Sequence, residues 1–305
     1  HFAHRTFSWT NEAKGKAAVH CVIVGFGLQD VAEKTIFEYE DIKGEALAVP
    51  VSNINPYLVD APDLVLEKRN QPICIVPTIS YGSMANDDGH LLLDKEQRNA
   101  LIAAEPATAP YIRRYMGAQE FLNNAERWCL WLKDISPSLM RSSNELRHRI
   151  EAVRKFRASS NREATRNLAA TPSLFGEDRQ PLKSYLLLPK VSSENRPYMP
   201  IGFMPSEVIA NGSALTISDS GHYEMGVLQS KMHMAWMRAV AGRMKSDYQY
   251  SAQIVYNNFP WPDLPEKLEP NKPQTPTHKA QAAIEKAAQA VLDARAQFPG
   301  SSLAD

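Results

Sequence analysis

Strand-length apolar segments, separated by turn residues, constrain the fold of this chain more than any other feature of its sequence. The longest runs, such as Val19–Phe26, are far shorter than the roughly 20 residues that a membrane-spanning helix needs. No signal-peptide pattern opens the chain, and its length of 305 residues suits about two domains. The pattern predicts a chain that is neither secreted nor membrane-embedded, with an α+β fold built from short elements.

Several apolar segments are predicted to be strands. Val19–Phe26 is nearly continuously apolar, which is typical of a strand buried on both faces, and most of its sheet is expected to lie upstream. Gln29–Lys43 is charged and predicts a linker. The remaining strand predictions are Ala46–Val51, Ile73–Val76, Arg127–Leu132, Ser184–Pro189, Tyr198–Phe203, Ala214–Ile217, Met225–Leu228 and Gln253–Trp261.

Helices are predicted where a capping residue precedes a helical pattern. Asp94 caps a helix that ends near Ala104, and Ser136-Pro137 opens a basic helix that reaches about Arg157. Two further helices are predicted at Lys231–Met244 and, with a narrow apolar stripe, at Ala280–Ala296. Between them, Asp263–Pro276 contains four prolines and predicts a linker.

Charge and cysteine content exclude several classes of protein. The 34 Lys and Arg residues balance 34 Asp and Glu residues, so nucleic-acid binding through bulk charge is excluded and any such contact needs a local patch. The three cysteines, Cys21, Cys74 and Cys129, are too few and too scattered for a disulfide framework or a metal site. A reducing, cytoplasmic location is expected.

Candidate catalytic motifs are incomplete. Val24-Gly25-Phe26-Gly27 lacks the third glycine of a nucleotide-binding turn, and no suitable helix follows it. Asn55-Pro56-Tyr57 carries one proline where the amine-binding loop of amino-methyltransferases carries two, so a turn is the better interpretation. His233 lies among large apolar residues and is interpreted as a packed histidine. No residue is predicted to be catalytic or to bind a metal ion.

The strongest local signal is a basic segment between Arg141 and Arg166. Eight cations face three carboxylates there, an excess of five positive charges in a neutral protein. Arginines at helical spacing suit DNA phosphates, although a solvated helix face with intrahelical ion pairs is the alternative. The candidate phosphate contacts are Arg147, Arg154, Lys155, Arg157 and Arg166, with Lys190 from a second patch.

The second patch is Lys190–Arg196. If this segment is extended, Glu194 and Arg196 project from the same face, because residues two apart do so in a strand. A carboxylate accepts from cytosine and an arginine donates to guanine, so the two side chains together match one C·G pair. A surface ion pair in a loop is the alternative.

Sequence motifs that follow one another along most of the chain resemble the C-terminal half of MmeI-like adenine-specific DNA methyltransferases, which are large bacterial restriction–modification enzymes. The motifs are Phe7-x-Trp9, Asn11–Ile23, Asn53–Leu58, Tyr81–Met84, Arg127–Leu132, Tyr198–Phe203, His233–Trp236 and Tyr256–Pro262.

The resemblance implies part of a methyltransferase that uses S-adenosylmethionine, bound upstream of this segment, together with a domain that recognises double-stranded DNA. The implied divisions are the end of the methyltransferase domain at 1–45, a recognition domain of mixed sheets at 46–203, the rest of the recognition region at 204–265, and a proline-rich linker with a terminal helix at 266–305. A nuclease domain is often fused to such enzymes. The implied base-recognition residues are Ser159, Ser160, Asn161, Arg162, Glu194, Asn195 and Arg196.

Two other classes of function stay open from the residues alone. The first is a self-contained hydrolase or transferase with an unrecognised site. The second is a protein-interaction module whose terminal helix, Ala280–Ala296, docks on a partner.

Overall fold

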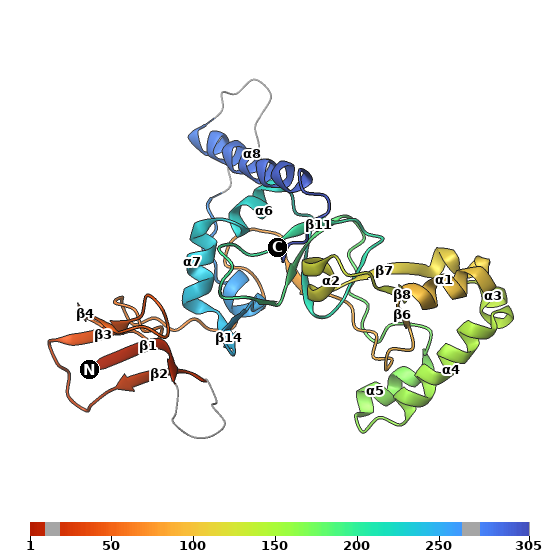
Figure 1. The fold of residues 1–305 in the computed structure, drawn as a ribbon, viewed down its shortest axis with the longest axis horizontal. Helices are drawn as coiled ribbons and strands as arrows, with labels where there is room; N and C mark the ends of the chain where they lie inside the picture. The colour runs from red at the N-terminus through yellow and green to blue at the C-terminus, as the bar shows by residue number, and fades with distance from the viewer. Residues whose placement is uncertain (10–18, 264–274, 305) are drawn as a thin grey trace.

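The computed structural model describes residues 1–9, 19–263 and 275–304, and it shows helices arranged around several small mixed sheets (Figure 1). The α+β prediction is therefore confirmed. Three parts follow one another along the long axis: an N-terminal sheet, a central part that holds the chain's C-terminal region, and a distal part that ends in a helical arm. Residues 264–274, which make up most of the predicted linker, lie outside the described residues.

The N-terminal sheet has the strand order β2-β1-β3-β4, in which β1 pairs antiparallel with β2 and parallel with β3. Its strands are β1 (Phe2–Trp9), β2 (Val19–Gly25), β3 (Lys34–Glu38) and β4 (Leu47–Val51). β2 is an edge strand, and Val22 and Val24 are half-exposed, so the predicted burial on both faces is wrong for the described chain. The predicted linker at 29–43 contains β3 instead, because Ile36 is buried in this sheet.

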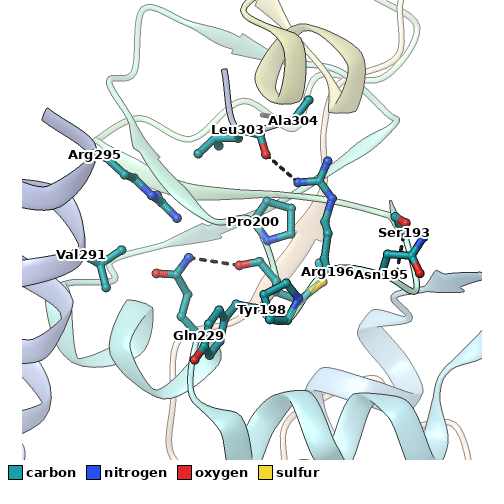
Figure 2. A pocket seen from close by; sticks show the side chains of 12 residues that line it. Ser193, Asn195, Arg196, Tyr198, Pro200, Gln229, Val291, Arg295, Leu303 and Ala304 are labelled. Atoms are coloured by element: carbon teal, nitrogen blue, oxygen red, sulfur yellow. Dashed lines mark hydrogen bonds between the residues drawn. The ribbon is translucent and has the colours of Figure 1, made fainter. Parts of the chain in front are cut away.

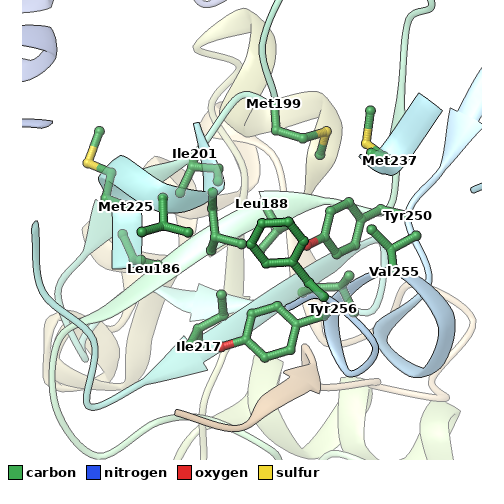
Figure 3. Close-up of a cluster of buried hydrophobic side chains, with 14 of the residues drawn as sticks. Leu186, Leu188, Met199, Ile201, Ile217, Met225, Met237, Tyr250, Val255 and Tyr256 are labelled. Carbon is green, nitrogen blue, oxygen red and sulfur yellow. The ribbon is translucent and has the colours of Figure 1, made fainter. Parts of the chain in front are cut away.

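The central part is built on an antiparallel sheet with the order β11-β9-β13-β5. Its strands are β5 (Ile79–Tyr81), β9 (Tyr185–Pro189), β11 (Gly202–Met204) and β13 (Ala214–Ser218). Leu186, Leu188 and Ile217 pack against Tyr250 and Tyr256 in the main core (Figure 3). The expected division between residues 203 and 204 falls inside β11, and the core contains residues from both sides of it.

Helices and a small sheet cover this core. They are α6 (His222–Leu228), α7 (Lys231–Val240), the π-helical turn η3 (Ala252–Tyr256), α8 (Pro276–Ala296) and the strands β10 (Val191–Ser192), β14 (Gly242–Met244) and β15 (Asp247–Gln249). The strand predictions at Met225–Leu228 and Gln253–Trp261 are wrong, because burial at positions three and four apart favours helical turns there. α7 ends at Val240, before the β14–β15 hairpin.

α8 packs on α6 of the same chain (Figure 1). Gly226 permits the close approach, since a Cβ there would lie 2.7 Å from Cγ2 of Ile284. Ala288 is buried at the same contact, and Ile284 and Leu292 pack against the main core. The apolar stripe of α8 thus packs against the rest of the chain. It is not available to bind a partner, as the protein-interaction alternative requires.

The distal part contains the mixed sheet β12-β7-β8-β6 and the helical arm. Its strands are β6 (Leu92–Leu93), β7 (Ile112–Met116), β8 (Trp128–Leu130) and β12 (Ile209–Ala210). Its helices are α1 (Lys95–Ala104), the 3₁₀-helix η1 (Pro106–Tyr111), α3 (Pro137–Ser142), α4 (Asn144–Ala158), α5 (Glu163–Asn167) and the 3₁₀-helix η2 (Leu168–Ala170). The short helix α2 (Ala118–Asn123) follows β7 and packs against β9 of the central sheet.

Capping decides where the distal helices begin. Asp94 accepts a hydrogen bond from the Gln97 amide over 2.8 Å, which confirms the predicted start of α1. Ser136 caps α3 as predicted, but the helix breaks at Ser143, whose hydroxyl caps α4. The predicted strand at Ile73–Val76 is absent from the described chain, and β5 follows it instead. None of the described helices is both long and apolar enough to cross a bilayer.

Candidate nucleic-acid interface

The basic helix α4 is anchored to the distal part at its N-terminus. The carboxylate of Glu105 accepts hydrogen bonds from the amides of Asn144 and Glu145 over 3.1 and 3.2 Å, and it contacts the Ser143 hydroxyl. A carboxylate at this end also complements the positive end of the helix dipole. The arm that α4 and α5 form therefore leaves the body of the molecule from a fixed point (Figure 1).

One face of α4 is buried and ends in an arginine. Leu146, Ile150, Val153 and Arg157 follow the spacing i, i+4, i+7, i+11, and all are buried. Arg157 is fully buried, and its five N–H donors bond to five backbone carbonyls at 2.7 to 3.0 Å. Those carbonyls belong to Ala85, Asn86, Leu168, Thr171 and Leu174.

The prediction that Arg157 contacts a phosphate is therefore wrong. Every donor of its guanidinium is already used inside the protein, and the side chain is closed to solvent. Burial lowers the pKa of Arg157, while the carboxylate of Asp87 acts in the opposite direction. Arg157 fixes the segment after α4 to the loop before β6.

The exposed face of α4 carries Arg147, Arg154 and Lys155, at the helical spacing i, i+7, i+8. Arg154 pairs with Glu151 over 3.1 Å, which is the intrahelical pairing expected of a solvated face. Arg147 donates to the side chain of Asn144, and Lys155 has no hydrogen bond or ion pair in the described chain. Intrahelical pairing thus holds for Arg154, whereas phosphate contact by Arg147 and Lys155 stays a prediction.

Across residues 141–166, five exposed cations have no carboxylate within ion-pair distance in the part of the chain that the structure describes. Arg149 is excluded from this set, because it pairs with Glu145 over 2.7 Å and is half-buried. The set consists of Arg141, Arg147, Lys155, Arg162 and Arg166. Unpaired cations on an exposed helical arm are available to a polyanion.

Residues Ser159–Arg162 form the connection between α4 and α5. The Ser159 hydroxyl donates to the Phe156 carbonyl, and the Ser160 hydroxyl accepts from the Arg162 amide. Arg166 donates to the Ser160 carbonyl over 2.9 Å, which braces the connection. Asn161 is exposed, so this turn presents short polar side chains at the end of the arm.

The second predicted patch is a turn. The Arg196 amide donates to the Ser193 carbonyl over 3.2 Å, and the Asn195 amide donates to the Ser193 hydroxyl. β10 has already ended at Ser192, so the extended geometry predicted for this segment is wrong. Lys190 is half-buried, donates to the Gly212 carbonyl, and lies 4.9 Å from the ring centre of Tyr81.

The turn directs Glu194 and Arg196 to different partners. Glu194 lies 3.8 Å from the guanidinium of Arg243, which stacks on Tyr248. Arg196 instead donates to the Leu303 carbonyl over 2.8 Å. The alternative of an ion pair between Glu194 and Arg196 is not what the structure shows, because each side chain has a separate partner.

Arg196 borders a cavity of about 670 Å³ (Figure 2). Arg295 forms another part of its wall and donates to the Ile201 carbonyl, while burial lowers the pKa of Arg295. Among the described residues, the Nε of Arg196 and the Oε1 of Gln229 are buried without a hydrogen-bond partner. The described residues that line the cavity include two arginines and no carboxylate, so the cavity favours a ligand that accepts hydrogen bonds.

Other candidate sites are structural. Asn55 is buried and its carbonyl oxygen Oδ1 accepts from the amides of Tyr57 and Val59, which confirms the turn interpretation. His233 is buried, packs edge-on against Phe259 and bonds to the Tyr250 hydroxyl over 2.9 Å, so the packed-histidine interpretation is also confirmed. Burial raises the pKa of the Cys129 thiol, which favours its unreactive protonated form.

Nothing in the described chain forms a metal site, since no group of three potential ligands comes together in it. In the same residues, no hydrogen bond or ion pair links the turn 159–162 to the turn 193–196. The sequence analysis did not single out Arg243, Arg295 or Leu303 as site residues. A signal for Arg243 was present in Gly242, because a glycine there favours an end of the predicted helix Lys231–Met244 before Arg243.

Comparisons with known proteins match three parts of this chain to domains of one family. The MmeI target recognition domain matches residues 60–263, the MmeI DNA-methyltransferase domain matches residues 1–38, and the MmeI C-terminal domain matches residues 276–305. DNA methyltransferase A of Bacillus subtilis (strain 168) is 39% identical over 264 residues, which are 86% of this chain and 29% of that protein.

A solved structure is also similar, that of the Type IIL restriction–modification enzyme MmeI in complex with DNA. It has a TM-score of 0.89 and 48% identity, and the match covers 99% of this chain and 39% of that chain. This chain therefore spans well under half the length of both relatives.

Proposed function

Because this chain belongs to the MmeI family and contains its target recognition domain, we propose that it selects the DNA sequence for an adenine-specific methyltransferase. The single observation that supports this most directly is the set of five exposed, unpaired cations between Arg141 and Arg166, four of which lie on the arm formed by α4, α5 and the turn between them. Such cations displace counterions from DNA phosphates and hold a protein in register on the duplex.

In this proposal basic side chains contact phosphates and the two polar turns read bases. The phosphate contacts are Arg147, Arg154, Lys155, Arg166 and Lys190. The base contacts are Ser159, Ser160, Asn161, Arg162, Glu194, Asn195 and Arg196. Arg154 and Lys190 exchange their partners in the protein for phosphate oxygens when DNA binds. The Glu194–Arg243 pair opens in the same way, so that Glu194 accepts from a cytosine amine while Arg196 donates to the paired guanine.

The proposal also assigns a role to the exposed apolar residues of the N-terminal sheet. Val22 and Val24 of β2 are exposed, as is Phe26, which directly follows the strand and is 88% exposed. Exposed apolar residues on one sheet are typical of a surface that another domain covers. We assign that surface to the upstream part of the methyltransferase domain, which binds S-adenosylmethionine and supplies the catalytic residues, and we place the domain boundaries near residues 45 and 265.

The reaction explains why a separate recognition domain is needed. The exocyclic amine of adenine is inaccessible to an active site while the base is stacked, so the enzyme flips the base out of the duplex. During this step the phosphate and base contacts hold the enzyme in place. The three free thiols, Cys21, Cys74 and Cys129, suit the bacterial cytoplasm, where DNA is modified.

The test is to map the modified sites of the full-length enzyme before and after Ser159–Arg162 is replaced by a Gly-Ser linker of equal length. We expect the recognition sequence to change or lose a base while S-adenosylmethionine binding is kept. A second variant, with Lys286 of α8 changed to alanine, controls for loss of an exposed cation elsewhere. The same recognition sequence with normal activity in the linker variant would exclude base reading by this turn.

A further inference from the structure

The segment after α8 lies against α2 and contacts Arg196. The Ser301 carbonyl accepts from the Asn124 side chain over 3.0 Å, and the Ala304 amide donates to the Leu122 carbonyl over 2.9 Å. Between them, Leu303 packs against a small apolar cluster that contains Met116, Phe121, Tyr185 and Leu187. Residues 301–304, called here the C-terminal strap, are therefore held by contacts at three successive points.

The strap occupies one end of the Arg196 guanidinium. The Leu303 carbonyl accepts from Nη1 over 2.8 Å (Figure 2). On the opposite side of the same group, Nε is buried and has no hydrogen-bond partner in the part of the chain that the structure describes. Buried donors are nearly always paired in folded proteins, so an unpaired one needs a specific reason.

A ligand bound in the neighbouring cavity would explain the unpaired Nε of Arg196. The cavity beside Arg196 has a second arginine, Arg295, and no carboxylate among the described residues of its lining. With Nη1 engaged by the protein, the edge formed by Nε and Nη2 is left for two acceptors side by side. The O6 and N7 atoms of guanine are such a pair in the major groove.

We propose that the C-terminal strap is a specificity-determining element that positions Arg196 through the Leu303 carbonyl, so that the Nε–Nη2 edge faces a guanine. This inference rests on the proposed function and adds a positioning residue to it. The strap holds the guanidinium in one orientation before DNA arrives, and less side-chain freedom is lost on binding. Leu303 contacts no base itself.

The experiment uses the full-length enzyme with Leu303→Gly, which removes the apolar anchor, and Leu303→Met, which keeps it. Asn124→Gly releases the strap at Ser301, and glycine tolerates the left-handed backbone at that position, where φ is 53°. Lys286→Ala on α8 is the matched control. Binding is measured on the cognate duplex and on duplexes changed at one base pair at a time, in wild-type and Arg196→Ala backgrounds.

We expect Leu303→Gly to lower discrimination by about 5-fold or more at the one base pair where Arg196→Ala also lowers it. Asn124→Gly acts in the same direction, and Leu303→Met and Lys286→Ala keep the wild-type ratio. In the Arg196→Ala background, Leu303→Gly has no further effect on discrimination, because the group that it positions is gone. A uniform loss of affinity for all duplexes would overturn the inference, as would additive effects of the two changes.

Two outcomes separate this inference from the proposed function. If Arg196→Ala lowers discrimination and the strap variants do not, the strap has no positioning role while base reading stands. If Arg196→Ala leaves the base preference unchanged, base reading by Arg196 fails, and the strap inference fails with it. Thermal unfolding of each variant shows whether the protein is folded, and Asn124→Gly provides the comparison if Leu303→Gly is unstable.

Discussion

Arg157 donates to the Leu174 carbonyl over 2.7 Å, although the two residues belong to segments on opposite sides of the α4–α5 turn. The same guanidinium donates to Ala85 and Asn86 in the loop before β6. A single buried side chain thus fixes the C-terminal end of α4, next to the turn Ser159–Arg162 that is proposed to read bases. The cation that sequence spacing assigned to DNA stabilises the fold instead.

Replacing Arg157 is therefore expected to act on stability. Arg157→Met removes five hydrogen bonds and leaves the Asn86 and Leu174 carbonyls without a donor among the described residues, so we expect a loss of about 3–5 kcal/mol in the free energy of unfolding. Arg154→Met, on the exposed face of the same helix, is the control and should change it by less than about 0.5 kcal/mol. Chemical unfolding measures both. A stable Arg157→Met variant with a weaker salt dependence of DNA binding would instead identify Arg157 as a phosphate contact.

Arg147 and Lys155 are expected to contact phosphates. Changing either to alanine in the full-length enzyme should weaken binding to cognate and random duplexes alike, and should reduce the slope of log K against log salt concentration by about 1 for each phosphate interaction removed. Lys286→Ala, on the exposed side of α8, is expected to leave the slope unchanged. The positioning role is excluded if either change alters only which sequence is bound.

Glu151→Ala provides an independent measurement on the same face. The Glu151–Arg154 pair is exposed, so breaking it costs little stability. The substitution Glu151→Ala releases Arg154 and removes a negative charge, so we expect tighter binding to random duplex DNA at low salt. Competition binding at several salt concentrations measures the effect. Unchanged affinity at every concentration would show that Arg154 does not reach a phosphate.

The double variant Glu194→Lys with Arg196→Asp tests base reading by the second turn. Donor and acceptor exchange places, so the preferred C·G pair should become G·C, and each single change should cost about 1–3 kcal/mol at that base pair. Arg243→Ala removes the partner of Glu194 in the free protein and should keep the wild-type recognition sequence. Mapping of modified sites decides the question, and an unaltered sequence with near-normal activity in the double variant contradicts base reading.

His233 predicts a dependence of stability on pH. Burial lowers its pKa from 6.5 to about 3. Between these values only the unfolded chain takes up the proton, so stability falls as pH falls, by up to about 1.4 kcal/mol per unit, and the effect levels off below pH 3. His233→Gln should lessen the fall between pH 6 and pH 4, relative to the exposed control His148→Gln. Equal slopes for the two variants would show that His233 is not the group responsible.

Local signals in the sequence were sufficient where a few neighbouring residues decide the structure. Asp94 and Ser136 start helices as predicted, because a cap bonds to amides only two or three residues away. The buried strands β8 and β9 follow from their apolar sequence, and Asn55 forms its turn through its own backbone neighbours. The long sequence motifs shared with the MmeI-like enzymes also indicate the family without any knowledge of the fold, because they can be recognised from the amino-acid sequence alone.

Tertiary packing decided the features that depend on distant residues. Met225–Leu228 is apolar enough for a strand or a helix, and contact with α8 makes it helical. Arg157 extends the buried stripe Leu146, Ile150 and Val153, yet only carbonyls brought from residues 85–86 and 168–174 make its burial favourable. The partner of Arg196 is 107 residues away along the chain. The sequence by itself determined the local elements and the family, whereas the availability of each cation to DNA depended on partners that only the folded chain brings into contact.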